Sequence, residues 1–200
     1  KNKSLGFSSS AGFSSANDFY HNFSYSLQNV ETEKLDSNDN KLSTDGGKVL
    51  SSVGYRISKD TRDNRFNPAS GYYYALSEQF AGLGGDVNYL SSVLRGSYYY
   101  KYDYVDLIVG ISGEYGNIEG IDENVSKTNR FFLGGRKVRG FDSSGIGPRT
   151  EENSSASAVG GNNYYAGRVA LRSGIGLPSE TGIQWTIFTD FGSLWGVDDT

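Results

Sequence analysis

The fold is decided by an alternation of side chains that is clearest in the stretch Phe19-Tyr20-His21-Asn22-Phe23-Ser24-Tyr25-Ser26-Leu27-Gln28. Its odd positions carry mostly large apolar side chains, whereas the even positions after Tyr20 carry Asn, Ser or Gln. A period of two residues places these two sets on opposite faces of a β-strand. His21 falls in the apolar row, and we assign it no role. The stretch therefore predicts a strand with one apolar and one polar face.

The same alternation returns along the chain, and no segment shows the 3.6-residue period that is typical of a helix. One of the apolar rows is interrupted by the acidic residue Glu78. Further alternating segments lie at 49–58, 72–80, 105–114, 165–172 and 183–190, with weaker ones near 4–13 and 91–100. The sequence therefore predicts an all-β fold of eight antiparallel strands.

Composition narrows the class of protein further. The 200 residues include no Cys, no Met and one His, which excludes a disulfide framework, a thiolate metal site and a site with several His ligands. A net charge of -4 gives no sign of a nucleic-acid surface. No apolar run approaches the roughly 18 residues of a membrane-spanning helix, so any membrane role must be built from strands or lie at the surface. We predict no cofactor and no bound metal.

The connections between the predicted strands are mostly short at one end of the sheet and mostly long at the other, apart from 60–71 and 81–90. Strands of about ten residues match the length that crosses a bilayer. This asymmetry is typical of an outer-membrane β-barrel, although the alternation by itself fits a soluble sandwich equally well. The predicted connections are 14–18, 32–47, 60–71, 81–90, 101–104, 116–162 and 173–181.

The stretch from Asp60 to Pro68 is rich in carboxylates and therefore has the composition of a cation-binding loop. It lacks the central Gly and the terminal Glu of a calcium-binding EF-hand. Its Asn and Pro residues favour a turn. We expect it to form a periplasmic turn.

The longest connection contains the motif Val138-Arg139-Gly140-Phe141, preceded by Gly134 and Gly135. This motif resembles the signature of the BamA-type family of outer-membrane-protein assembly factors. Further stretches resemble the family in the same order, from about residue 48 to residue 195, in the style of its alphaproteobacterial members. They are Asp60–Asn64 with Asn67, Pro68 and Gly71, then Phe80–Asp86, Asn163–Gly167 and Asp190–Trp195.

The resemblance implies that the loop with Arg139 folds into the barrel lumen and pairs there with Asp190 and with a Glu on the preceding strand. The Glu position is occupied by Ala170 in this chain, so Glu114 is a candidate for the second acid. The alternation independently puts Asp190 on the polar face, where it is a natural bidentate acceptor for a guanidinium. The neighbouring glycines Gly134, Gly135 and Gly140 allow the tight backbone path that such a loop requires.

The resemblance also implies how much of a barrel is present. The eight strands correspond to roughly the sixth to the thirteenth of a barrel of about sixteen strands. We therefore expect residues 1–200 to form a partial outer-membrane barrel domain with a lumen-inserted loop at about 116–162. The polypeptide-transport-associated (POTRA) domains and the closing strands of the family are not in this sequence, so we expect it to be part of a longer protein or a larger assembly.

The function that the resemblance implies is the insertion of β-barrel proteins into the bacterial outer membrane by a non-enzymatic scaffold. Its implied partners are outer-membrane lipids, unfolded barrel clients and periplasmic assembly lipoproteins. Other readings stay open at this point. Within the family they are a two-partner secretion pore and a translocation-and-assembly barrel. Outside it they are a small passive porin or adhesin barrel and a soluble binding sandwich.

Overall fold

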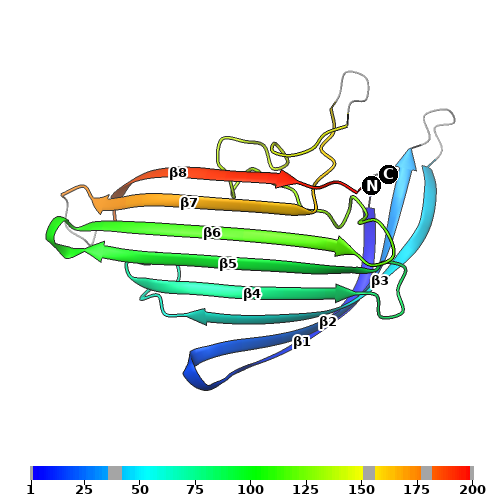
Figure 1. The fold of residues 1–200 in the computed structure, drawn as a ribbon, viewed down its shortest axis with the longest axis horizontal. Helices are drawn as coiled ribbons and strands as arrows, with labels where there is room; N and C mark the ends of the chain where they lie inside the picture. Colours follow the sequence, from blue (N-terminus) through cyan, green and yellow to red (C-terminus); the bar gives the residue numbers. More distant parts are fainter. Residues whose placement is uncertain (1, 36–41, 151–155, 177–181, 199–200) are drawn as a thin grey trace.

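The computed structural model describes residues 2–35, 42–150, 156–176 and 182–198. Eight strands form one antiparallel sheet in which each strand lies beside its neighbour in the sequence, in the order β1-β2-β3-β4-β5-β6-β7-β8 (Figure 1). No described helix is long and apolar enough to cross a membrane. The predicted all-β fold of eight strands is therefore confirmed, and a sandwich of two packed sheets is excluded.

The strands are longer than predicted, with lengths between 11 and 19 residues. Their bounds are β1 Asn2–Ser14, β2 Phe19–Leu35, β3 Leu42–Asp60, β4 Gly71–Ala81, β5 Tyr89–Tyr102, β6 Leu107–Gly120, β7 Asn163–Gly174 and β8 Gln184–Trp195. Two short 3-10 turns, η1 (Ala16–Asp18) and η2 (Asp103–Val105), lie in connections at one end of the sheet.

Ladder pairing explains why the predicted ends were too early. The pairing of β2 with β3 continues to the couple Leu35 and Leu42, well inside the predicted connection 32–47. The pairing of β5 with β6 continues to the couple Tyr89 and Gly120. The long connection is therefore 121–162, instead of 116–162. Polar residues extend these strands because each added pair satisfies backbone groups that would otherwise lack partners.

Because neighbouring strands pair in register, their apolar rows join into one face of the sheet and their polar rows into the other. The outer face carries the apolar rows, and many of its side chains are exposed, among them Leu5 at 83% and Ile187 at 64%. The acidic residue Glu78 lies in this face and accepts a 2.5 Å hydrogen bond from the Ser92 hydroxyl of the paired strand. The inner face carries Ser, Arg and acidic side chains. An exposed apolar band on one side of a single sheet fits contact with lipid.

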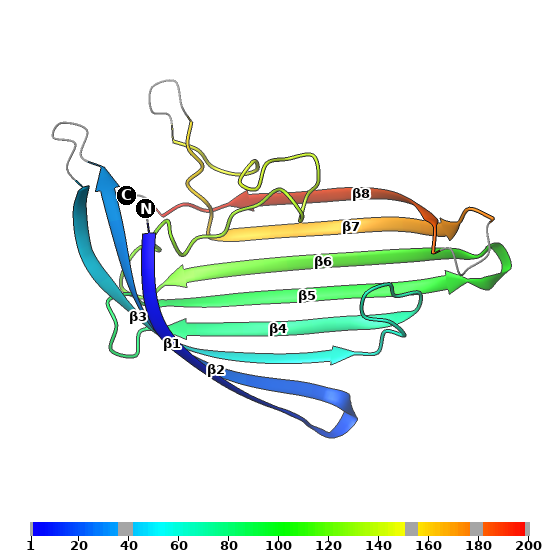
Figure 2. The ribbon, with the colours of Figure 1, turned by 180° about the vertical axis from the view of Figure 1, so that it is seen from behind.

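The buried apolar residues lie on the inner face, where the 121–162 loop packs against the strands. Figure 2 shows this loop folding back beside β7 and β8. Each of two clusters combines loop residues with strand residues. One contains Leu133, Val138, Tyr164, Ala166 and Leu194, and the other contains Ala81, Tyr89, Ile118 and Val125. The loop therefore completes two apolar clusters that the strands begin on an inner face rich in polar side chains.

The connection from β3 to β4 uses its acidic residues internally. The Asp63 carboxylate accepts hydrogen bonds from the backbone N–H groups of Ala69 and Ser70, at 2.9 and 3.1 Å. These bonds hold the pKa of Asp63 below its ordinary value, and the bond from Ser70 has the largest effect. The Pro68 carbonyl accepts a hydrogen bond from Arg172 of β7, so this connection reaches across the inner face. The turn prediction for this stretch agrees with these contacts.

Gly116 on the inner face of β6 tests the packing of the core. A methyl group at this position would overlap the ring of Tyr164, which is 1% exposed. We expect Gly116→Ala to lower the free energy of unfolding by about 1–3 kcal/mol through overpacking. Urea unfolding in detergent, followed by tryptophan fluorescence, measures this change.

The matched control is Gly96→Ala on β5, because the atom nearest to a methyl group there is the Tyr73 carbonyl oxygen at 4.0 Å. Replacing a strand glycine that has free space is neutral or slightly stabilising. Equal losses of stability in both variants would contradict the packing argument.

Candidate functional site

The predicted motif lies at a tight turn of the 121–162 loop. Gly134, Gly135 and Gly140 have φ values of 138°, 57° and 91°, a region that side chains other than Gly rarely adopt. The Gly135 N–H donates to the Phe141 carbonyl at 2.9 Å and closes the turn. The turn thereby presents residues 137–139 to the inner face of the sheet.

Val138 and Phe141 have opposite environments. The Val138 side chain is 3% exposed and belongs to the cluster formed with Leu133, Tyr164, Ala166 and Leu194. Phe141 is 53% exposed. Within the motif, Val138 therefore provides the apolar contact with the sheet, and the ring of Phe141 does not.

The structure brings Arg139 and Asp190 together. The guanidinium donates from Nε to Oδ2 at 2.6 Å and from Nη2 to Oδ1 at 2.9 Å, and the Arg139 backbone N–H donates to Oδ2 at 3.1 Å. The Asp190 side chain is 3% exposed, whereas that of Arg139 is 38% exposed. The guanidinium also lies 3.1 Å from the ring centroid of Phe188. A bidentate pair with a cation–π contact fixes both the position and the orientation of the loop tip.

Asp190 binds a second guanidinium, that of Arg168 on β7. Arg168 is the direct cross-strand partner of Asp190, and its Nε lies 2.6 Å from Oδ1. Its Nη2 donates to the backbone carbonyl of Arg136 at 3.1 Å. Ala170 on the same strand supplies no carboxylate, and Arg168 joins the network as an additional cation.

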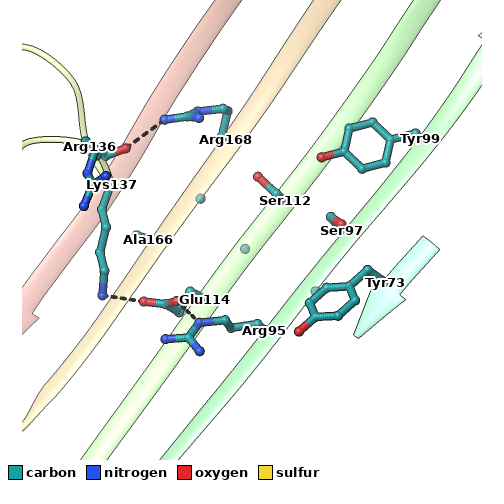
Figure 3. Close-up of a pocket in the computed structure, with 13 residues that line it drawn as sticks. Tyr73, Arg95, Ser97, Tyr99, Ser112, Glu114, Arg136, Lys137, Ala166 and Arg168 are labelled. Carbon is teal, nitrogen blue, oxygen red and sulfur yellow. Dashed lines mark hydrogen bonds and ion pairs between the residues drawn. The ribbon is translucent and has the colours of Figure 1, made fainter. Parts of the chain in front are cut away.

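Glu114 pairs with Lys137, which directly precedes the motif, and not with Arg139. The Lys137 Nζ lies 2.5 Å from Oε1 of Glu114, and Arg95 donates to the same carboxylate (Figure 3). The Tyr164 hydroxyl also donates to it. The ammonium also lies 4.2 Å from the ring centroid of Tyr164. The loop is therefore held at two carboxylates, Asp190 on β8 through Arg139 and Glu114 on β6 through Lys137.

Sequence reasoning assigned no role to Lys137 or Phe188. Lys137 directly precedes the motif, and Glu114 has the parity of the polar face, so the two signals existed separately. Nothing in the sequence indicated which of the cations near the motif would reach which acid. Phe188 is an aromatic residue in a polar row, and it gave no signal.

The base of the loop is tied down by Asp198. Its carboxylate accepts hydrogen bonds from Asn162 Nδ2 at 2.8 Å and from the Val125 N–H at 2.7 Å. The bond from Asn162, more than that from Val125, holds the pKa of Asp198 below its ordinary value. The Val125 carbonyl in turn accepts from Arg130 Nε at 3.0 Å.

These observations define a class of protein. One antiparallel sheet of consecutive strands has an apolar outer face and a polar inner face, and a long loop is held on the inner face by ion pairs. A membrane β-barrel has this arrangement, with the loop inside the lumen. The site makes ionic and hydrogen-bonded anchors, which suit a mechanical role.

The chain belongs to the Omp85 superfamily, whose domain model matches residues 1–200. It is 33% identical over its full length to the outer membrane protein assembly factor BamA of Neorickettsia risticii, covering 27% of that protein. It is 28% identical to BamA of Nitratidesulfovibrio vulgaris, over 68% of this chain and 18% of that one. A SAM50-like protein of Schizosaccharomyces pombe is 30% identical, over 63% of this chain and 27% of that one.

The fold agrees with a solved structure, the crystal structure of BamA from Haemophilus ducreyi lacking POTRA domains 1-3. The TM-score is 0.78 at 18% identity, and the match covers 98% of this chain and 42% of that one. The chain spans about a quarter of the length of the curated relatives it matches. The predicted resemblance, the barrel fold and the outer-membrane location are confirmed. The two BamA relatives are assembly factors by name, which supports the non-enzymatic prediction.

Replacing Arg139 tests the anchor. We expect Arg139→Ala to raise the rate of amide hydrogen exchange in residues 134–141 about tenfold or more, because the loop tip loses both guanidinium bonds to Asp190. The exchange rate in Arg139→Lys should lie between those of the unchanged protein and Arg139→Ala, since a lysine keeps the charge but not the bidentate geometry. Lys127→Ala removes an exposed cation from the same loop and serves as the control. Unchanged exchange in Arg139→Ala would show that the pair does not hold the loop.

A charge exchange gives a second test. The double change Arg139→Asp with Asp190→Arg places the new guanidinium beside Arg168, which loses its own partner. We therefore expect the double variant to remain loosened, by the same hydrogen-exchange measurement. Adding Arg168→Gln should restore part of the protection. Full restoration by the double variant alone would contradict the role given to Arg168.

The lowered pKa of Asp198 predicts that the stability of the protein depends on pH. Because its pKa is lowered in the folded state, its contribution to stability is present above the ordinary pKa of about 4 and is lost as the pH falls through the lowered value. We expect Asp198→Asn to be less stable than the unchanged protein at pH 6 and the difference to shrink towards pH 2. Urea midpoints at several pH values measure it. A difference that stays constant with pH would contradict the assignment.

Proposed function

We propose that the intact protein carrying this chain inserts β-barrel proteins into the bacterial outer membrane, and that this chain supplies part of the barrel scaffold. The observation that supports this most is the double anchorage of the loop tip, through Arg139 on Asp190 and Lys137 on Glu114. The family membership and the names of the relatives point to the same role.

The anchors suggest how the scaffold works. The loop tip is bound to three adjacent strands at once, through Asp190 on β8, through Glu114 on β6, and through Arg168 on β7, which donates to a backbone carbonyl of the loop. Such cross-linking resists bending of this part of the sheet, because the ion pairs would have to break. A stiff wall confines opening to a weaker seam elsewhere in the barrel. An unfolded client can then add strands to the open seam by β-augmentation.

The proposed partners are those that the family resemblance implies. The outer face meets outer-membrane lipids, the clients are unfolded β-barrel proteins, and periplasmic lipoproteins assist assembly. The remaining strands, which close a barrel of about sixteen, and the POTRA domains belong to the intact protein. Val138, Gly140 and Phe141 complete the motif around Arg139, with Gly134 and Gly135 shaping its approach.

The test is client folding in proteoliposomes that contain the intact protein. A urea-denatured small outer-membrane barrel is added, and its folded fraction is read from heat-modifiable migration on a gel. We expect faster folding than in empty liposomes. We expect Arg139→Ala to slow it about tenfold and Lys127→Ala to leave it unchanged.

The outcomes separate the alternatives. Folding no faster than in empty liposomes would contradict the insertase function. Passage of an unfolded polypeptide into the liposome without insertion would favour a secretion pore. Leakage of small solutes as the one activity would favour a passive porin.

A further inference from the structure

A hollow of about 290 Å³ lies on the inner face between the anchored loop and strands β4 to β7. Its middle is formed by the small residues Ser97, Ser112 and Ala166 from three adjacent strands (Figure 3). Ser97 and Ser112 are direct cross-strand partners, and so are Ser112 and Arg168. We propose that this hollow binds the phosphate group of a ligand inside the barrel lumen, an inference that goes beyond the assembly function and does not rest on it.

The charges around the hollow do not balance. Four cations line it, and Glu114 is the one carboxylate among its lining residues. Glu114 is already shared by Lys137 and Arg95, and the nearby Asp190 is shared by Arg139 and Arg168. The cations of the lining are Arg95, Arg136, Lys137 and Arg168. A concave site with an excess of one charge attracts the opposite charge.

Arg136 contributes most clearly to the excess of positive charge around the hollow. Within the described ranges its guanidinium has no hydrogen-bond or ion-pair partner, although its backbone carbonyl accepts from Arg168. Figure 3 shows Arg136 and Lys137 on one side of the hollow, and Tyr99 and Tyr73 on the opposite side. An anion in the middle would therefore have donors on both sides.

The number of unused donors favours phosphate over carboxylate. Arg95 donates to Glu114 through Nε and also interacts with the Tyr164 hydroxyl, so the unused donors of the hollow come from Arg136 and from the hydroxyls of its lining. The hydroxyls of Ser97, Ser112 and Tyr99 have no hydrogen-bond partner in the described part of the chain. Guanidinium and hydroxyl donors are typical of phosphate recognition, and a carboxylate has too few oxygens to use them all.

The experiment is isothermal titration calorimetry on the intact protein in a nonionic detergent, at constant ionic strength. One arm uses inorganic phosphate, and the other uses water-soluble dihexanoyl phosphatidylglycerol below its micelle concentration. We expect saturable binding. Binding in the phosphate arm assigns the site to a free phosphate group, and binding in the lipid arm alone assigns it to a lipid headgroup. No saturable binding in either arm would overturn the proposal.

Two variants locate the binding in the hollow. Arg136→Gln removes the unpaired guanidinium, and Ser112→Val removes a hydroxyl and fills the middle of the hollow. We expect each to weaken binding about tenfold or more, with circular dichroism showing an unchanged fold. Lys127→Gln, which removes an exposed cation from the same loop outside the hollow, should stay within twofold. Equal affinity in Arg136→Gln, Ser112→Val and the unchanged protein would overturn the proposal.

Discussion

The structure depends most on the carboxylate of Asp190 and its two guanidinium partners. An acidic side chain that is 3% exposed on a sheet must be paired, because an isolated buried charge costs several kcal/mol. Its partners come from different places, Arg139 from the loop and Arg168 from the adjacent strand. The Asp190 carboxylate thereby joins the loop to β7 and β8, beside the second anchor of Lys137 on Glu114. In this position Val138 and Leu133 pack against Tyr164, Ala166 and Leu194 of the strands.

A second constraint comes from the two faces of the sheet. Alternation gives every strand an apolar and a polar row, and in-register pairing makes each row continuous over eight strands. The apolar face suits lipid. The polar face has little apolar surface of its own, so the loop contributes Val125, Leu133 and Val138 to the two buried clusters. The loop is therefore a structural part of the barrel wall as well as the carrier of the motif.

The sequence predicted the face on which a charged residue lies more reliably than the residue with which it pairs. The parity of Asp190 and Glu114 placed both acids on the polar face, and the motif pointed to Arg139 as the loop cation. Lys137 was missed because the partner of a loop side chain depends on the path of the backbone. Strand ends were missed for a related reason. The ladder continues as long as a neighbouring strand offers backbone groups, which the polarity of a strand end such as Gly120 does not reveal.

The sequence by itself determined the strand count, the two faces and the class of membrane protein. The strand count and the two faces are local features, since a period of two residues assigns each side chain to a face whatever the strand pairs with. The class of membrane protein followed from the connection lengths and from the motif around Arg139. The tertiary structure alone decided which charges meet. It joined Lys137 to Glu114, and it gave Asp190 two guanidinium partners. It also gathered an excess of cations around one hollow. Such contacts link residues that are distant in sequence, and their pairing follows only from the folded path of the loop.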